Sequence, residues 1–344
     1  MGEGKQALLS CSSPLTPGTN IEGQLAQHLS TPLTPESVKK YKEVKAQRGQ
    51  DAQEFLRQEA FAPLVEKVHV EDSEVDYPET PNHRFPVRIY RPPMTTAEKF
   101  PVMLYFHGGY WSAGDYYSED LGCRAIIARG CHIIIYSFSY RLIGQAPWHE
   151  LFSDAEHAMK WLWSNASTLG ADVNKGFLVG GAEAGAHLAA ICTIRARNKY
   201  PNIAISGQCL IVPTLIAWPD PEIPKEWEDG LMSHVEQADA PILNEALYEQ
   251  LVDALNVPAE QKRVGENFPM WGPLHDLPRA YLAMDECDPT RDQGFLYEKL
   301  LRRAGVNTRT DYYRGLPNMF VQFPGLPTTA GAGGHFKQYL VNEL

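Results

Sequence analysis

The chain has 344 residues, which is enough for one large domain with a well-buried core. Hydrophobic residues make up 44% and charged residues 21%, the balance of a globular protein. The net charge of −11 argues against nucleic-acid and anionic-membrane partners, because no broad cationic field would hold phosphates.

Targeting and metal-binding signals are missing from the sequence. No run of roughly 18 apolar residues occurs, and residues 1–25 lack the apolar stretch of a signal peptide. We therefore expect a cytoplasmic protein. The six cysteines show no metal-ligand spacing, and no phosphate-binding loop is present, so we expect no metal and no organic cofactor.

The N-terminal 60 residues form the first predicted unit. Residues 1–34 are rich in Ser, Thr, Pro and Gly, which is typical of an arm that orders only where it packs on the body. Thr34 followed by Pro35 predicts the start of a helix that runs to about residue 60, because Thr caps a helix and Pro suits its first turn. We assign residues 1–60 to an N-terminal arm and cap helix.

Short β-prone runs follow, and the pattern then changes near residue 100. From there continuous apolar runs alternate with helical stretches. Such alternation predicts a mostly parallel sheet with helices on both faces, the α/β class. The expected strands cover residues 65–70, 87–90, 102–106, 132–136, 176–179, 208–212, 280–284 and 308–313.

Residues 218–275 interrupt this alternation. The segment is acidic, rich in Pro and dotted with Trp, and it separates two predicted strands of the sheet. Insertions of this size commonly cover a site, so we expect a helical lid. Residues 61–344 are then one α/β domain that carries this lid.

Three separate motifs suggest chemistry. His107-Gly108-Gly109 follows a predicted strand, and glycines there let backbone N–H groups approach a ligand. Gly181-Ala182-Glu183-Ala184-Gly185 has the small residues of the strained Gly-x-Ser-x-Gly nucleophile elbow, with Glu183 at its centre. Asp288 and Asn318 stand on two late loops, at the places where proteins with such an elbow carry an acid and a histidine base.

These motifs together resemble the hormone-sensitive-lipase-like branch of the α/β hydrolases, especially its fungal esterase-like members. The resemblance covers about residues 85–340. Tyr140-Arg141-Leu142 is similar to the start of the family's YRLAPE run, although residues 143–145 depart from it. Residues 238–243 resemble a lid phrase, and residues 315–320 match GLPHGF with Asn for His. HGGYW and AGAHLAA are also similar to kynurenine formamidases.

The resemblance implies a role for each position. Glu183 takes the nucleophile place, Asp288 the acid place and Asn318 the base place, while Gly108, Gly109 and Ala184 would supply oxyanion-hole N–H groups. A serine hydrolase needs a hydroxyl activated by an adjacent base. Because this chain has neither at those places, we do not expect an ordinary serine esterase.

The sequence favours general acid–base chemistry by Glu183 over other functions. A buried carboxyl can give and take protons, and Asn318 with the backbone amides would hold a carbonyl or enolate. We expect a non-hydrolytic isomerase, dehydratase or cyclase that acts on a hydrophobic, carbonyl-bearing intermediate of fungal natural-product metabolism. The resemblance supports this, since 2-hydroxyisoflavanone dehydratase uses the same scaffold.

Other functions stay open. Gibberellin receptors resemble the same branch and also lack the base histidine, so a catalytically dead binding protein is one alternative. A pericyclic cyclase that works by pocket shape is another. An atypical esterase with Glu183 as nucleophile would need a base to clear its ester intermediate, and Asn318 cannot accept that proton. His335 would stand in only if the tail folds back. The oligomeric state is not readable, although relatives are often dimers, so a homodimer is also open.

Several further side chains fall on loops expected to surround the site, and each has a simpler reading as ordinary packing. His187, one turn past the elbow, is expected to pack within its helix. The predicted substrate-binding side chains are His107, Tyr110, Trp111, Trp218, Met319 and Phe320.

Overall fold

A computed structural model describes residues 35–77, 83–93 and 99–322 of the chain. The predicted N-terminal arm, the helix-capping Thr34 and His335 lie outside the described residues.

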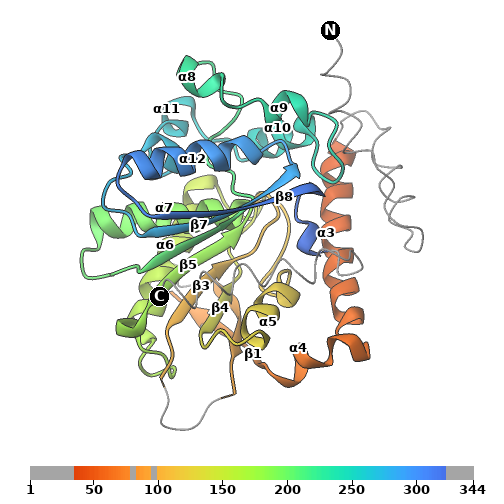
Figure 1. The fold of residues 1–344 in the computed structure, drawn as a ribbon, viewed down its shortest axis with the longest axis vertical. Helices are drawn as coiled ribbons and strands as arrows, with labels where there is room; N and C mark the ends of the chain where they lie inside the picture. Colours follow the sequence, from red (N-terminus) through yellow and green to blue (C-terminus); the bar gives the residue numbers. More distant parts are fainter. Residues whose placement is uncertain (1–34, 78–82, 94–98, 323–344) are drawn as a thin grey trace.

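One eight-stranded sheet forms the centre of the molecule (Figure 1), in the order β1-β2-β4-β3-β5-β6-β7-β8. β1 pairs antiparallel with β2, and β2 with β4, whereas all other neighbours are parallel. This confirms the predicted mostly parallel sheet. The strands are β1 (His69–Asp76), β2 (Arg84–Arg91), β3 (Val102–Phe106), β4 (Ile134–Phe138), β5 (Phe177–Ala182), β6 (Gly207–Ile211), β7 (Arg279–Cys287) and β8 (Thr308–Pro317).

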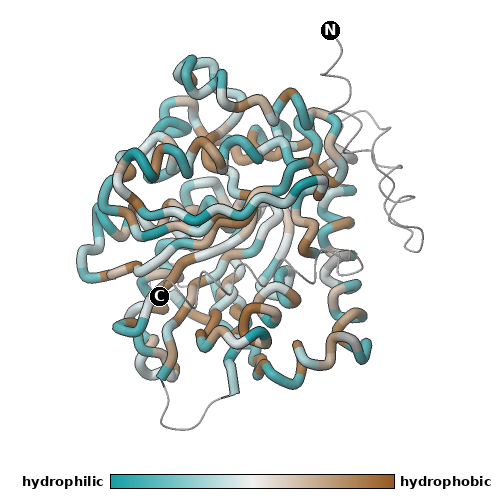
Figure 2. Tube along the Cα trace, in the orientation of Figure 1, coloured by the Kyte–Doolittle hydropathy of each residue, from teal (hydrophilic) through white to brown (hydrophobic). Residues whose placement is uncertain are grey.

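The two faces of the sheet bury two separate cores because successive side chains of a strand point to opposite faces. In β3, Val102, Leu104 and Phe106 join the larger core, whereas Met103 and Tyr105 join the smaller one. All five side chains are buried. The central strands therefore read as continuous apolar runs, and Figure 2 shows hydrophobic positions gathered along them.

Helices cover both faces. The larger core contains side chains from α6 (Trp148–Asn165), α7 (Ala184–Lys199) and α12 (Arg291–Arg303), and the smaller one side chains from α5 (Asp120–Ala128). Residues 218–275 hold no strand and carry α8 (Lys225–Glu228), α9 (Ser233–Glu236), α10 (Glu245–Ala254) and α11 (Ala259–Lys262); their expected role as a lid stays a prediction. The remaining helices are α3 (Pro35–Phe55), α4 (Ala62–Glu66), η1 (Glu59–Phe61), η2 (Val173–Lys175), η3 (Pro269–Trp271) and η4 (Phe320–Gln322).

α3 contacts residues 218–275 and reaches the centre of the molecule. It begins at Pro35, as predicted, and ends at Phe55. It packs against α10 and stands beside the sheet in Figure 1. Its inward face carries Tyr41, Lys45 and Ala52, all buried. A helix remote in sequence thus presents a lysine to the interior.

Several predicted strand boundaries differ from the structure, and those of the first and last strands differ most. The strand expected at residues 65–70 begins only at His69, because the short helix α4, which has Pro63 in its first turn, continues to Glu66. The last strand extends beyond Tyr313 to Pro317.

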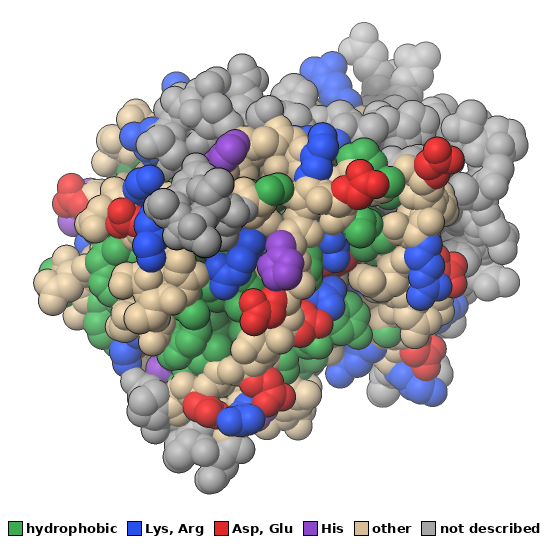
Figure 3. All heavy atoms as spheres, turned by 90° about the horizontal axis from the view of Figure 1, so that it is seen from below, with side chains coloured by type: hydrophobic (Ala, Val, Ile, Leu, Met, Phe, Trp, Pro, Cys, Tyr) green, Lys and Arg blue, Asp and Glu red, His purple; other side chains and the backbone are tan. Residues whose placement is uncertain are grey.

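The surface carries charges of both signs. On the face in Figure 3, acidic and basic side chains alternate with hydrophobic ones and form no single-sign field. Within the described ranges, none of the helices has the length and apolar character needed to span a bilayer.

Candidate active site

Glu183 stands at the tip of a tight turn between β5 and α7. Its φ of 50° and ψ of −116° lie in a region that non-glycine residues rarely adopt. The turn depends on glycine neighbours. A Cβ on Gly185 would lie 2.1 Å from the carbonyl oxygen of Phe106, and a Cβ on Gly181 would lie 2.4 Å from the backbone of Gly185. The predicted elbow geometry is therefore present, with a carboxylate at the nucleophile place.

Two donors hold one oxygen of that carboxylate. Glu183 Oε2 accepts hydrogen bonds from Lys45 Nζ at 2.9 Å and from the Gly109 N–H at 2.5 Å. The approach needs glycine at position 108, because a Cβ there would lie 2.5 Å from Oε2. Both side chains of the Lys45–Glu183 ion pair are almost fully buried, with 4% and 0% exposed. The ammonium and the amide stabilise the negative charge in a place that water does not reach.

The sequence analysis missed Lys45 as a residue of the candidate site. It lies 138 residues from Glu183 in the chain, so no local motif connects the two. A signal was nevertheless present: Lys45 falls four residues after Tyr41, on the helix face that turns inward. Since a buried carboxylate needs a partner, a lysine on a buried helix face was the residue to look for.

The two loop glycines serve the protein's own carboxylates. The Gly109 N–H is occupied by Glu183, and the Gly108 N–H points to Glu119 Oε1 at 3.4 Å. Glu119 also accepts a hydrogen bond from Gln322 Nε2 at 2.8 Å, and burial raises its pKa. Both amides therefore face carboxylate oxygens of the protein itself, and their contact with a substrate oxyanion stays a prediction.

Asn318 and Asp288 come together as the resemblance implies. Asn318 Nδ2 donates to Asp288 Oδ2 at 2.9 Å, and Asp288 Oδ1 accepts from the N–H and hydroxyl of Thr290 at 2.7 and 2.9 Å. Arg291 instead pairs with Asp292 and Glu236, so Asp288 orients Asn318. Burial raises the pKa of Asp288 to about 6, although the Asn318 hydrogen bond offsets part of the effect.

His107 is held in one tautomer. Its Nδ1–H donates to the Gly108 carbonyl at 2.7 Å, and its ring stacks on Tyr140 at 4.3 Å. Burial lowers its pKa to about 4, so the ring is neutral near pH 7 and Nε2 carries a lone pair. Tyr110 and Trp111 follow on the same loop, fully buried and with φ of 46° and 56°.

Five polar atoms of the predicted site residues are buried and lack a hydrogen-bond partner among the described residues. Three of them are the acceptors Glu183 Oε1, Asn318 Oδ1 and His107 Nε2; the other two are the Tyr110 hydroxyl and the Trp111 Nε1–H donor. They share one electrostatic neighbourhood, since Glu183 acts on the pKa of His107, Tyr110 and Asp288. Buried unpaired polar atoms cost stability, so their grouping around the elbow calls for a functional explanation.

The remaining predicted residues make packing contacts. Trp218 stacks on His234 at 4.5 Å, Met319 packs with Ala182 and Val212, and the Phe320 ring lies 4.9 Å from Tyr313. Ala184 begins α7 and is fully buried. Substrate contact by Trp218, Met319 and Phe320 stays a prediction.

His187 has a structural place, as predicted. Its Nε2–H donates to the Asn267 carbonyl at 2.6 Å, and its ring lies among those of Trp111, Phe152 and Phe268. Burial lowers its pKa to about 3, so it packs as a neutral ring.

The comparisons with known proteins agree with this architecture. A family model described as the alpha/beta hydrolase fold matches residues 103–322. The chain belongs to the α/β-hydrolase family. Esterase LipI of Mycobacterium tuberculosis is 33% identical to this chain, and the match covers 80% of this chain and 82% of the esterase. A versiconal hemiacetal acetate esterase of Dothistroma septosporum is 26% identical over 77% of each chain.

Solved structures share the fold as well. An esterase of the archaeon Pyrobaculum calidifontis matches with a TM-score of 0.78 at 26% identity, over 96% of this chain and 99% of that one. Vibralactone cyclase matches with a TM-score of 0.72 at 24% identity, over 96% and 89%. This family frame makes the Glu183 elbow and the Asn318 loop the candidate active site.

Proposed function

We propose that the protein is a non-hydrolytic enzyme in which Glu183 acts as general acid and base on a hydrophobic, carbonyl-bearing substrate. One observation carries the proposal: Lys45 and Gly109 fix one oxygen of the carboxylate, while the other, Oε1, is buried and unpartnered. A fixed carboxylate with one vacant oxygen is suited to accept a proton from a bound ligand and to return it.

Ester hydrolysis through the usual triad needs a nucleophilic hydroxyl and a base, and neither stands at the corresponding positions of this chain. The elbow offers no hydroxyl, and Asn318 in the base place cannot take up a proton. The Gly109 N–H, which would stabilise an oxyanion, is bonded to Glu183. The curated relatives named above are esterases, so the proposed loss of hydrolysis rests on these substitutions and contacts.

Isomerisation, dehydration and ring closure all need a group that accepts and returns a proton, and the Glu183 carboxylate is such a group. Each begins or ends with proton transfer at a carbon or oxygen near a carbonyl group. The vacant acceptors Asn318 Oδ1 and His107 Nε2 suit hydroxyl or N–H groups of the same substrate. Fungal relatives named for a hemiacetal acetate support a setting in natural-product metabolism.

Hydrogen–deuterium exchange tests the proposal without knowledge of the natural substrate. A panel of hydrophobic ketones in D₂O would be followed by NMR for exchange of the α-hydrogens. We expect the wild-type protein to accelerate exchange for at least one ketone and Glu183→Gln to lose the effect. Exchange that survives in Glu183→Gln would refute the role of Glu183.

A binding protein without catalysis is the second candidate. The observation that favours it is the buried ion pair from α3, which neutralises Glu183 and covers the elbow. A receptor of this kind would bind hydrophobic ligands with wild-type and Glu183→Gln protein alike and would exchange no ligand hydrogen.

A further inference from the structure

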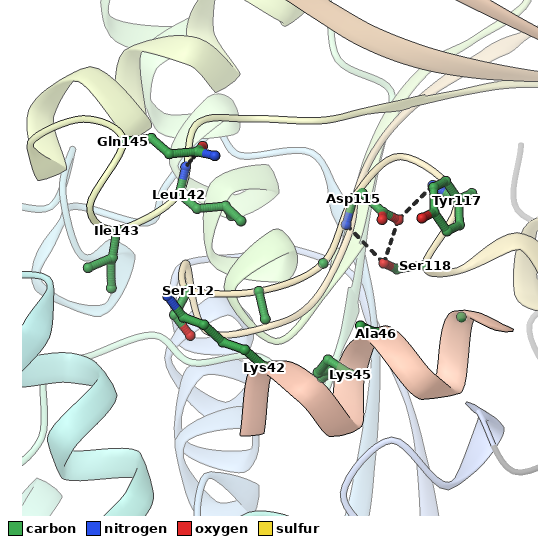
Figure 4. Close-up of a pocket in the computed structure, with 13 residues that line it drawn as sticks. Lys42, Lys45, Ala46, Ser112, Asp115, Tyr117, Ser118, Leu142, Ile143 and Gln145 are labelled. Carbon is green, nitrogen blue, oxygen red and sulfur yellow. Dashed lines mark hydrogen bonds between the residues drawn. The ribbon is translucent and has the colours of Figure 1, made fainter. Parts of the chain in front are cut away.

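A cavity of about 380 Å³ lies between α3 and two loops of the sheet domain, residues 112–118 and 142–145. Its size is within the range of small-molecule sites. Figure 4 shows Lys42 and Lys45 on the α3 side and Leu142 and Ile143 across the space. Lys45 forms part of the wall, whereas Glu183 does not. A ligand in this cavity therefore meets Lys45 before it meets Glu183.

The Lys45 side chain joins the cavity to the candidate active site. Its side chain is 4% exposed, and its Nζ lies 2.9 Å from Glu183 Oε2. The Gly109 amide is already bonded to Glu183, so it is not available to a ligand carbonyl. Lys45 is thus the residue that both borders the ligand-sized space and contacts the elbow carboxylate through its amine.

We propose that Lys45 forms an imine with a hydrophobic aldehyde or ketone bound in this cavity, and that Glu183 moves the protons. The inference rests on the proposed function of Glu183 and adds a covalent partner to it. Lysine amines form such imines with carbonyl substrates when an adjacent group handles the proton.

The steps balance within the pair. The Lys45 ammonium gives one proton to Glu183, and the free amine adds to the carbonyl carbon. The two hydrogens that remain on that nitrogen pass to the carbinolamine oxygen, which leaves as water while the C–N double bond forms. Glu183 then returns its proton to the imine nitrogen. As a carboxylate again, it can remove a hydrogen from the carbon next to the iminium group.

The cavity also indicates the class of ligand. Ala46, Ala113, Leu142 and Ile143 supply apolar surface, and the Asp115 carboxylate accepts hydrogen bonds from Ser118 Oγ and the Tyr117 N–H. Figure 4 shows these last contacts on the far side of the space from Lys42. An apolar carbonyl compound fits this lining better than a multiply charged one.

Reductive trapping tests the proposal. The full-length protein would be incubated with hexanal and sodium cyanoborohydride, and labelled lysines would be mapped by mass spectrometry after digestion at glutamate. Exposed Lys42 on the same cavity and exposed Lys67 on the surface are internal controls. We expect Lys45 to gain the hexyl group several-fold faster than either, although it is the most buried of the three.

Two variants sharpen the result. Ile143→Trp fills the cavity and should lower labelling of Lys45 several-fold with no change at Lys67. Glu183→Gln should slow labelling of Lys45 alone. Labelling of Lys45 at or below the rate of Lys42, or equal labelling in Ile143→Trp, would overturn the imine proposal. Unchanged labelling in Glu183→Gln would overturn the proton transfer.

The outcomes separate this proposal from the proposed function. If Lys45 is not labelled but ketone exchange still depends on Glu183, the imine is wrong and the acid–base role stands. If Lys45 is labelled but no exchange depends on Glu183, the cavity captures carbonyl compounds without the proposed catalysis.

Discussion

At the residue scale, the site is defined by a carboxylate that has partners on one oxygen only. Lys45 and Gly109 hold Glu183 Oε2, and Oε1 has no partner among the described residues. Glu183→Gln keeps the shape of the side chain but cannot shuttle a proton. We expect a folded protein with turnover reduced at least about 100-fold, the usual contribution of general acid–base catalysis. Steady-state rates on a substrate found by ketone screening, with circular dichroism as the folding control, measure this.

The buried ion pair makes a separate prediction for stability. Lys45→Met leaves a buried carboxylate without its counter-charge, so the free energy of unfolding should fall by about 3–5 kcal/mol. Adding Glu183→Gln removes the isolated charge and should restore more than half of that loss. Urea unfolding of the wild type, the two single variants and the double variant forms a complete cycle. Strictly additive losses would show that the two side chains do not interact.

At the element scale, the elbow depends on the close packing of α7 against the end of β3. A Cβ on Gly185 would lie 2.1 Å from the Phe106 carbonyl oxygen, closer than any real contact. Gly185→Ala should therefore prevent folding or cost several kcal/mol by overpacking, of the order of 3 kcal/mol. Gly122 in α5 is the matched control, since nothing lies within 4 Å of its Cβ position. Gly122→Ala should raise stability by about 0.5–1 kcal/mol. Equal melting temperatures for the two variants would contradict this packing.

Sequence patterns predicted elements well where one local cause decides them. The apolar run at Val102–Phe106 and the small residues around Glu183 each reflect a constraint visible over a few residues. The strand expected from Val65 does not form there because α4, with Pro63 in its first turn, continues to Glu66. Lys45 escaped prediction because its partner is 138 residues away and depends on how α3 docks. The hydrogen bond from the Gly109 N–H to Glu183 also escaped prediction, because it joins residues that are far apart in the sequence.

At the scale of the whole molecule, buried acids link stability to pH. Asp288 has a pKa of about 6 in the folded protein, above the usual value of about 4 for an unfolded chain. The folded state therefore binds more protons than the unfolded state between these values. The extra proton bound by Asp288 stabilises the folded state below about pH 4, and this stabilisation is lost as the pH rises through 6.

Asp288→Asn should remove this pH-dependent stabilisation. The difference in unfolding free energy between variant and wild type should move in favour of the variant as the pH rises from 4 to 6. His107 and His187 have lowered pKa values and act in the opposite direction, but they are common to both proteins and cancel in the difference. Urea unfolding across this range gives the difference curve, and a flat curve would show that Asp288 does not titrate differently on folding.

The most direct test of the central claim is an assay with a short-chain p-nitrophenyl ester on the purified full-length protein, with Glu183→Ala as control. Because the elbow has no hydroxyl and the Asn318 place has no base, we predict no turnover above that of the control. Ester turnover by the wild-type protein that disappears in Glu183→Ala would contradict the account and make Glu183 a working hydrolase residue.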